Sequence, residues 1–322
     1  MDYQKYFDGS LIKTKEEDTK EKYIKRSFQL INRVKKDFNV TNEDLDPRQI
    51  VVWLNDYKPN INPQTWRQYK NSLIYFFETT DMFSESAVID AIEYLKDTNS
   101  KGTNRFTEKT SSLKLKKITL DDWEKLNSYL KSKNRKWHDE LRVWLRSSII
   151  TGLRPVEWKN AEIIKKNDFY ILKTKNAKNT NGRAHGKERV LILKDVSNED
   201  LITIKTHLNN IKTFVGMGEY EFFYSGCYIA LYKACRKCWP RRKRHITLYS
   251  TRHQFSANAK SSGFSKVEVA AMMGHAVDTT AGEHYGRKQA GNEELSVLPS
   301  VDDVSKVRQI NGDQSFNVDN QE

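Results

Sequence analysis

The sequence predicts a mainly α-helical protein that carries a small antiparallel β-sheet and divides into two domains. The first hundred residues hold several amphipathic helical segments with short connections. A polar stretch then interrupts the apolar periodicity, and two short β-like runs appear later among further helical segments. At 322 residues, the chain is long enough for two domains of ordinary size, each with its own core.

The N-terminal helices are marked by apolar spacing and by capping residues. Between residues 16 and 38, apolar side chains recur every three to four positions, as on an amphipathic helix. Asp46-Pro47 and Asn62-Pro63 each place a cap residue before a proline at the first helical position. With a further helix after Ser84, these signals predict a small all-α domain over residues 1–97.

The next segment, residues 98–117, is rich in Ser, Thr, Lys and Gly, and we expect a basic interdomain linker there. A second domain is predicted over residues 118–298. One of its helices ends at Gly152, which is typical of a helix C-terminus. From 299 to 322 the chain turns polar, and we expect a flexible or partner-binding tail.

Residues 161–194 change from a helical to a strand pattern. Two β-like runs, DFYILKTK and ERVLILK, flank a polar loop rich in Asn and Gly, which predicts a hairpin with a long basic tip. Within residues 173–189, the single acid Glu188 stands against Lys173, Lys175, Lys178, Arg183, Lys187 and Arg189. A second basic run, Arg241, Arg242, Lys243 and Arg244, follows a later helical segment; we expect the nearby Trp239 to pack in the core rather than stack on a ligand.

The net charge of +13 and the pI of about 9.4 indicate a polyanionic partner, with nucleic acid the first candidate. No apolar run approaches the roughly 18 residues that a membrane span needs, and the N-terminus lacks the apolar segment of a signal peptide. We therefore expect a cytoplasmic protein that does not bind membranes. The three cysteines fit a reducing compartment, and Cys235 and Cys238 lack the second pair that a structural zinc site needs, so no metal site is predicted.

The stretch from Leu248 to Lys288 gathers Arg252, His253, His275, His284 and Tyr285 directly after the basic run. An arginine, a histidine and a tyrosine beside a polyanion-binding surface suggest chemistry on a phosphodiester. A second arginine, Arg154, lies in the corner between two predicted helices. Alone it is expected to pair with Glu157, but a guanidinium in such a corner also suits two phosphate oxygens at once.

Four motifs, together with the lysine-bearing hairpin, give the chain a family resemblance. In order they are TGLRPVEW (151–158), YSTRHQF (249–255), MMGH (272–275) and HYGR (284–287). Their order and spacing resemble those of the tyrosine recombinases, the phage-integrase family, over about residues 118–290. The resemblance implies an α-helical core-binding domain followed by an α+β catalytic domain of the kind shared with type IB topoisomerases.

Carried over residue by residue, the resemblance makes Tyr285 the nucleophile, Arg154 and Arg252 the phosphate-binding arginines, and His275 the histidine after Met-Gly. It implies a catalytic lysine in the hairpin, with Lys175 the first choice and Lys178 the second. Many members have a histidine three residues before the second arginine, where this chain has Tyr249. A phenol is a poor base near neutral pH, so we expect His275 to take the proton from Tyr285.

The expected function is therefore a site-specific DNA recombinase that acts through a 3′-phosphotyrosine intermediate and integrates or excises a mobile element. The expected partners are duplex DNA with specific recombination sites, further copies of the chain in a homo-tetramer, and accessory DNA-bending or directionality proteins, in a bacterial or phage-host nucleoid. No cofactor is expected. The expected DNA-binding residues are Lys178, Arg183, Lys187, Arg241, Arg242, Lys243 and Arg244. Two alternatives stay open: a type IB topoisomerase-like or resolving enzyme, and an inactive DNA-binding regulator.

Overall fold

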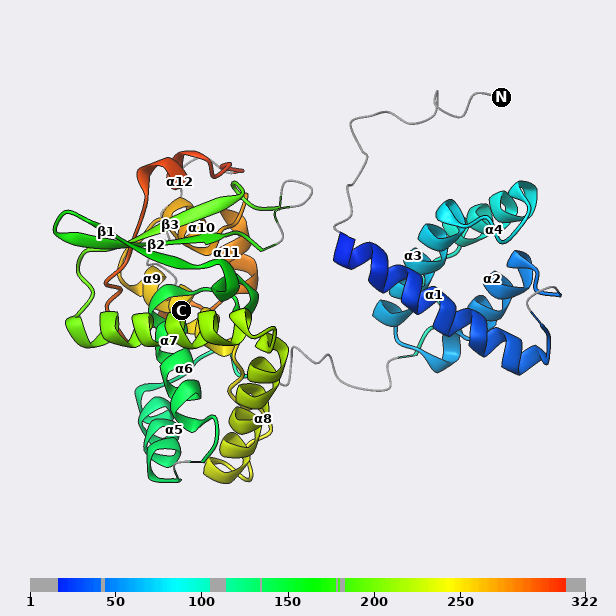
Figure 1. Ribbon diagram of the computed structural model, residues 1–322. Helices are drawn as coiled ribbons and strands as arrows, with labels where there is room; N and C mark the ends of the chain where they lie inside the picture. The colour runs from blue at the N-terminus through cyan, green and yellow to red at the C-terminus, as the bar shows by residue number, and fades with distance from the viewer. Residues whose placement is uncertain are drawn as a thin grey trace, which may run out of the picture. The chain divides into compact units, whose positions relative to one another are not determined.

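The computed structural model describes residues 17–41, 44–104, 114–133, 135–177, 179 and 183–310. The predicted fold class is confirmed, because the chain is mainly helical with one small antiparallel sheet. It divides into two compact units, Met1–Lys109 and Thr110–Glu322 (Figure 1). Each unit has a separate hydrophobic core.

The first unit is all-α. Its helices are α1 (Glu17–Phe38), α2 (Pro47–Asp56), α3 (Pro63–Thr79) and α4 (Glu85–Asp97), with the short 3-10 helix η3 (Lys58–Asn60) between α2 and α3. Two of the expected caps form: the Asp46 carboxylate accepts from the backbone N–H of Arg48 at 2.9 Å, and the Asn62 amide oxygen accepts from that of Thr65 at 2.8 Å. Ser84 precedes α4 but makes no side-chain cap hydrogen bond. All four helices contribute apolar side chains to one core.

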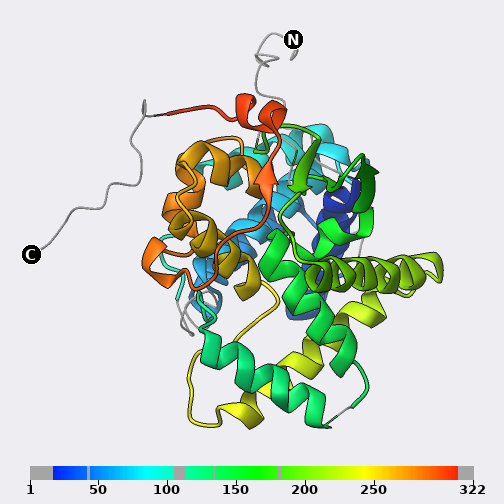
Figure 2. The same cartoon turned by 90° about the vertical axis from the view of Figure 1, so that its left-hand side faces the viewer.

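The second unit contains eight α-helices among its described residues. In chain order they are α5 (Leu120–Lys133), α6 (His138–Thr151), α7 (Asn198–Gly216), α8 (Tyr220–Cys238), α9 (Ser250–Ser261), α10 (Lys266–Met273), α11 (Thr279–His284) and α12 (Val301–Ser305). Two 3-10 helices, η4 (Pro155–Asn160) and η6 (Lys288–Ala290), interrupt the loops. The sheet and α12 lie toward one end of the unit, and α5 and α8 lie toward the other (Figures 1 and 2).

The sheet has the order β1-β2-β3-β4, with every pair antiparallel. Its strands are β1 (Glu162–Lys166), β2 (Phe169–Lys175), β3 (Glu188–Leu193) and β4 (Leu298–Pro299). The predicted hairpin is β2–β3, in register from Tyr170 opposite Leu193 to Lys175 opposite Glu188. β1 and β4 extend it on either side.

The chain after Leu298 differs from the expected polar tail over its first part. Residues 298–299 form β4 and pair with β3, and α12 follows at once. The Asp303 carboxylate accepts from the backbone N–H of Val190 at 2.7 Å, and Val307 packs against α10. The polar composition of this segment did not predict its structure, because only a few contacts hold so short a segment in place. Residues 311–322 lie outside the described residues.

Within the described chain, no helix is both long enough and apolar enough to cross a bilayer. The three cysteines are free and buried, and burial raises the pKa of Cys235 to about 12. Among the residues that the structure describes, His, Cys, Asp and Glu side chains form no group of three that could hold a metal ion.

Candidate active site

The first arginine of the site is placed by the end of α6. Gly152 ends this helix with φ 65°, a left-handed conformation that suits glycine. A Cβ at Gly152 would lie 2.3 Å from the ring of Phe255, so the glycine also lets α6 approach α9 closely. Two residues later, Arg154 is extended and Pro155 opens η4. This corner turns the Arg154 side chain toward the centre of the unit, where it is buried.

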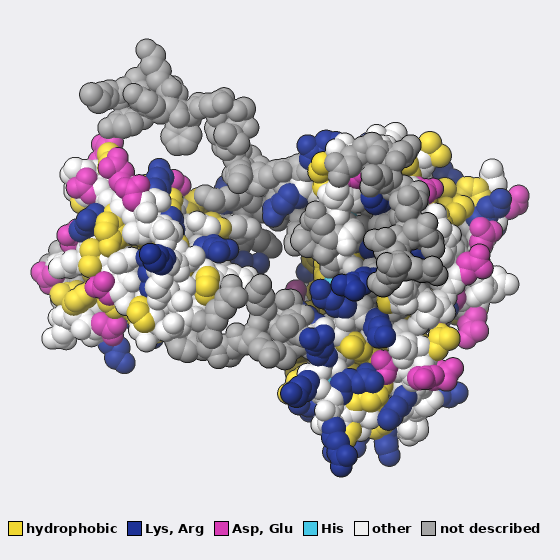
Figure 3. Space-filling view, turned by 180° about the vertical axis from the view of Figure 1, so that it is seen from behind, with side chains coloured by type: hydrophobic (Ala, Val, Ile, Leu, Met, Phe, Trp, Pro, Cys, Tyr) yellow, Lys and Arg dark blue, Asp and Glu magenta, His cyan; other side chains and the backbone are white. Residues whose placement is uncertain are grey.

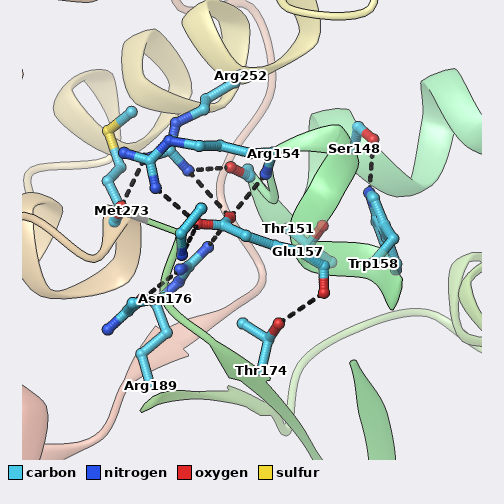
Figure 4. A network of polar contacts seen from close by, with 12 residues as sticks. Ser148, Thr151, Arg154, Glu157, Trp158, Thr174, Asn176, Arg189, Arg252 and Met273 are labelled. Atoms are coloured by element: carbon cyan, nitrogen blue, oxygen red, sulfur yellow. Dashed lines mark hydrogen bonds and ion pairs between the residues drawn. The ribbon is translucent and has the colours of Figure 1, made fainter. Parts of the chain in front are cut away.

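Glu157 lies at the centre of the site (Figure 4). Arg154 donates from its guanidinium to Glu157 Oε1 at 2.6 Å and from its backbone N–H to Oε2 at 2.7 Å. Arg189, from β3, donates to Oε2 at 2.7 Å. The guanidinium of Arg252, from α9, lies 3.8 Å from the same oxygen. One carboxylate therefore joins three guanidinium groups from three elements.

This cluster carries a buried excess of positive charge. All four side chains are buried, and three guanidinium groups against one carboxylate leave an excess of two positive charges. Burial alone would raise the pKa of Glu157, but the charges of Arg189, Arg252 and Arg154 hold its pKa well below the usual range, so it stays ionised. A buried site with unbalanced positive charge is suited to an anion.

Arg252 connects the parts of the site that lie far apart in the sequence. Its guanidinium donates to the carbonyl oxygen of Gly152, at the end of α6, and to that of Met273, at the end of α10. It also lies 3.3 Å from Nε2 of His275. Two backbone carbonyls and one imidazole therefore fix its planar fork.

The contact with Arg252 also determines the tautomer of His275. Because a guanidinium can only donate, Nε2 of His275 accepts and its ring proton lies on Nδ1. Burial, followed by the charges of Arg252 and Arg154, lowers the pKa of His275 to about 2, so the ring stays neutral. Nδ1–H is a buried donor that finds no hydrogen-bond partner among the described residues.

Tyr285 follows α11 and lies beside this cluster. Its hydroxyl oxygen is 3.0 Å from that of Tyr249, its ring centroid is 5.1 Å from that of His275, and the guanidinium carbon of Arg252 lies 5.4 Å from its ring centroid. Burial raises the pKa of Tyr285, but the charge of Arg252, the hydrogen bond from Tyr249 and the charge of Arg154 outweigh it, and the pKa falls to about 8. The pKa of Tyr249 is raised by its burial. Tyr285 is therefore the phenol of this pair that ionises.

The structure brings together five of the six expected catalytic residues, namely Arg154, Arg252, His275, Tyr285 and Tyr249. It does not bring Lys175 into contact with them. Alternation along the strand turns Thr174 and Asn176 inward, where the Thr174 hydroxyl donates to the Glu157 carbonyl at 2.8 Å, and leaves Lys175 exposed on the other face. Lys178 lies outside the described residues.

Of the expected DNA-binding residues, Arg183, Lys187, Arg241, Lys243 and Arg244 are exposed. Lys and Arg side chains gather on the second unit toward the end where α8 lies (Figure 3). Arg242 differs from the others, because it donates to Asp122 at 2.8 Å and stacks over the ring of Trp239 at 4.5 Å. Its guanidinium is thus used in holding the basic loop in place. Trp239 packs against the core, as expected.

Sequence reasoning did not identify Arg189 and Asn176 as site residues, and it treated Glu157 only as a local partner of Arg154. Arg189 donates to the amide oxygen of Asn176 at 2.5 Å, and the Asn176 amide donates to the carbonyl oxygens of Gly186 and Glu188. These contacts join the start of the hairpin loop to its end. The strand pattern offered a signal for Arg189. Side chains alternate along β3, so Arg189 lies on the face opposite to Val190 and Ile192, and this face points inward.

Solved structures, rather than sequence families, resemble this chain. No family model and no curated protein matches it. Solved structures that resemble it include a lambda integrase tetramer bound to a Holliday junction, with 18% identity, a TM-score of 0.47 and coverage of 90% of this chain and 77% of the other. A lambda integrase dimer bound to a COC′ core site has 16% identity and a TM-score of 0.46, with coverage of 91% of this chain and 78% of the other. XerH site-specific recombinase bound to difH substrate has 15% identity and a TM-score of 0.45, with coverage of 82% of this chain and 75% of the other. At these identities, the functional assignment rests on the geometry of the site itself.

Proposed function

We propose that this protein is a site-specific DNA recombinase of the tyrosine recombinase family, which cleaves and rejoins DNA through a 3′-phosphotyrosine intermediate. The observation that carries the proposal is the position of the Tyr285 hydroxyl beside a buried cluster with an excess of two positive charges. A nucleophile of lowered pKa next to a buried excess of positive charge is the arrangement that phosphoryl transfer requires.

The cluster offers donors that suit a phosphodiester. Nε of Arg154, Nε of Arg252 and Nδ1 of His275 are buried and have no hydrogen-bond partner in the structure. Donors held rigidly in a dry site stabilise the charge that develops on non-bridging oxygens in the transition state. Glu157 keeps two of the three guanidinium groups in place without cancelling their charge.

In the proposed reaction, the Tyr285 oxygen attacks phosphorus and the bond from phosphorus to the 5′-oxygen breaks. The DNA 3′-phosphate becomes esterified to Tyr285, and the leaving strand gains a 5′-hydroxyl. One phosphoester bond forms as the other breaks, so attack by another strand's 5′-hydroxyl on the phosphotyrosine reverses the step without an external energy source. We propose Lys175, which is exposed at the end of β2 where the basic hairpin loop begins, as the acid that protonates the leaving oxygen.

The proton of Tyr285 is assigned differently from the expectation that His275 takes it. Nε2 of His275 already accepts from Arg252, whereas the Tyr249 hydroxyl contacts that of Tyr285. We propose that Tyr249 donates a hydrogen bond to the Tyr285 phenolate and that solvent removes the proton. With a pKa of about 8, roughly a tenth of Tyr285 is ionised at pH 7, against about a thousandth for an ordinary tyrosine.

The partners follow from the same proposal. The exposed basic residues of the hairpin loop and of the run 241–244 would contact phosphates of duplex DNA, whose contribution to affinity is large and dependent on salt. Assembly of a homo-tetramer on paired sites, accessory directionality proteins and a role in moving a mobile element remain part of the proposal, as does a cytoplasmic location.

The test is covalent trapping on nicked DNA. A tiled pool of nicked duplexes from the DNA that flanks the coding gene is incubated with the full chain, and adducts that survive denaturation are resolved by size. We expect an adduct with the wild type and none with Tyr285→Phe. Tyr228→Phe is the matched control, because this exposed tyrosine on α8 lies outside the site.

Each outcome has a defined meaning. If every duplex fails to give an adduct while the protein still binds some of them, the recombinase proposal is wrong and the regulator alternative is favoured. If adducts form, two further assays separate the enzymes. Exchange of strands between two sites supports recombination, whereas relaxation of supercoiled plasmid without exchange supports the topoisomerase-like alternative.

A further inference from the structure

The segment that follows Tyr285 rests on helix α9 over several residues. A Cβ at Gly286 would lie 2.3 Å from the carbonyl oxygen of His253, and one at Gly291 would lie 2.0 Å from the hydroxyl of Ser261. Both positions therefore require glycine. His253, Ala257 and Ser261 are each four residues apart, so they form one stripe along α9 against which this segment packs.

Polar side chains of α9 and of Ser262, which caps its C-terminus, hold the later part of this segment. The Gln254 amide donates to the carbonyl of Ala290 at 2.8 Å, the Asn258 amide oxygen accepts from the backbone N–H of Asn292 at 3.1 Å, and the Ser262 hydroxyl accepts from that of Leu295 at 2.8 Å. The end of the segment is thus fixed without any contribution from the residues next to Tyr285.

Lys260 holds the start of this segment, at the residue directly after Tyr285. Its ammonium donates to the carbonyl oxygen of Gly286, the residue after Tyr285, at 2.7 Å. The side chain is only 3% exposed, and burial lowers the pKa of Lys260 to about 8. Burying an ammonium group is unfavourable, so an apolar side chain would serve better if this position had only to fill the core.

Helix α9 also supplies the groups that surround the Tyr285 hydroxyl. Arg252 lies in its first turn and Tyr249 directly precedes it. One rigid element therefore carries the guanidinium, the phenol donor and the ammonium that holds the peptide after the nucleophile. A shift of the Gly286 peptide relative to α9 would move the Tyr285 oxygen relative to both Tyr249 and Arg252.

We infer that Lys260 is a positioning residue, which holds the Gly286 carbonyl so that the Tyr285 hydroxyl reaches Tyr249 and the Arg252 guanidinium. This inference rests on the proposed function, in which Tyr285 is the nucleophile. It assigns Lys260 no contact with DNA or with the reacting phosphate.

The test uses the full chain with Lys260→Met, which keeps the length of the side chain and removes its donor. The ionisation of Tyr285 is followed by ultraviolet absorbance at 295 nm, as the difference from Tyr285→Phe. We expect this titration to move from near pH 8 toward the ordinary tyrosine value. With nicked DNA at saturating concentration, we expect the first-order rate of adduct formation to fall roughly 10- to 100-fold, while the Kd for DNA stays unchanged.

Two variants complete the design. Ser262→Ala removes a hydrogen bond from the same helix to the far end of the segment, and we expect it to keep both the titration and the rate. Lys260→Arg restores a cationic donor, and we expect it to recover part of the rate that Lys260→Met loses. Recovery by a donor is not expected if the position only fills space.

The inference is overturned if Lys260→Met keeps the wild-type titration and rate. It is also overturned if the rate falls only in proportion to a loss of folded protein or of DNA affinity, because that would mark a general structural role. Failure of the proposed function is distinguishable, since the wild type would then form no adduct. In that case the absorbance titration alone decides whether Lys260 positions Tyr285.

Discussion

The hydroxyl of Tyr249 lies 3.0 Å from the hydroxyl of Tyr285, and both phenols stand beside the buried guanidinium of Arg252. Arg252 lies over the Tyr285 ring, and its charge lowers the pKa of both phenols, but burial outweighs it at Tyr249, whose pKa stays raised. Tyr249 consequently keeps its proton and donates a hydrogen bond to the Tyr285 oxygen. In the proposed reaction, the pair therefore acts as a hydrogen-bond donor and a nucleophile rather than as a base and a nucleophile.

Replacing Tyr249 should shift the pH dependence of DNA cleavage. Tyr249→Phe removes the donor, and a hydrogen bond to a charged group contributes about 1.5–3 kcal/mol, or roughly one to two pKa units. The pKa of Tyr285 rises, so the ascending limb of the pH–rate profile should move to higher pH and the rate at pH 7 should fall at least roughly tenfold. Tyr249→His offers a donor again and should restore part of the rate. A Tyr249→Phe profile identical to that of the wild type would contradict this role.

Glu157 should control stability in acid. Its folded pKa is lowered from the ordinary 4.5, so its contribution is fully present above about pH 4.5 and is lost as the pH falls toward the folded value. Glu157→Gln leaves three buried guanidinium groups without a carboxylate, which we expect to cost about 3–5 kcal/mol of unfolding free energy at pH 7. Denaturant unfolding between pH 7 and pH 3 should show a steep loss for the wild type and a flatter profile for the variant. Parallel profiles would be inconsistent with this account.

Gly274 should tolerate no side chain. It has φ 67°, and a Cβ there would lie 2.3 Å from the Asn176 amide oxygen and 2.8 Å from the Arg189 guanidinium. Gly263 has φ 88°, and a Cβ there would have nothing within 4 Å. Gly263→Ala is therefore a matched control for backbone strain alone. We expect Gly263→Ala to cost about 1–2 kcal/mol and Gly274→Ala to cost more and to reduce adduct formation as well. If the two variants lose the same amount of stability in thermal unfolding and the same amount of activity, the contact with Asn176 is unimportant.

The neighbouring residues Arg241 and Arg242 should behave differently in DNA binding. Arg241 is exposed, so Arg241→Ala should lower the dependence of log Kd on log salt by about one counterion. Arg242 is bound to Asp122, so Arg242→Ala should disturb the loop that carries the other basic residues. Asp122→Asn then provides the decisive comparison, because it leaves the charge of the loop intact. It should weaken binding if Arg242 acts through the loop and should have no effect if Arg242 contacts DNA directly.

The sequence predicted what depends on local pattern and on motif spacing. Proline and its cap residue predicted the starts of α2 and α3, and Gly152 predicted the end of α6. The four motifs placed Arg154, Arg252, His275 and Tyr285 on short elements that the structure brings together. These features depend on few residues each, so they can be recognised without knowing the fold.

The remaining features depend on contacts between residues far apart in the chain. Glu157 and Arg189 are separated by 32 residues, and Arg242 and Asp122 by 120. Nothing near Arg242 distinguishes it from Arg241, and only the fold reveals that one has a carboxylate partner. Likewise, the strand that contains Lys175 was visible in the sequence. The face of that strand that points toward Glu157 was not, because it depends on how β2 pairs in the sheet.

All of the residues placed around Tyr285 belong to the second unit, whose core is separate from that of the first. Under the proposed function, the residues that cleave and rejoin the strand all lie in one unit, so they can be inherited independently of the four-helix unit. The further proposal that the first unit helps to choose the DNA makes that unit the natural part to exchange for a new specificity, because the contacts around Glu157 come from the second unit.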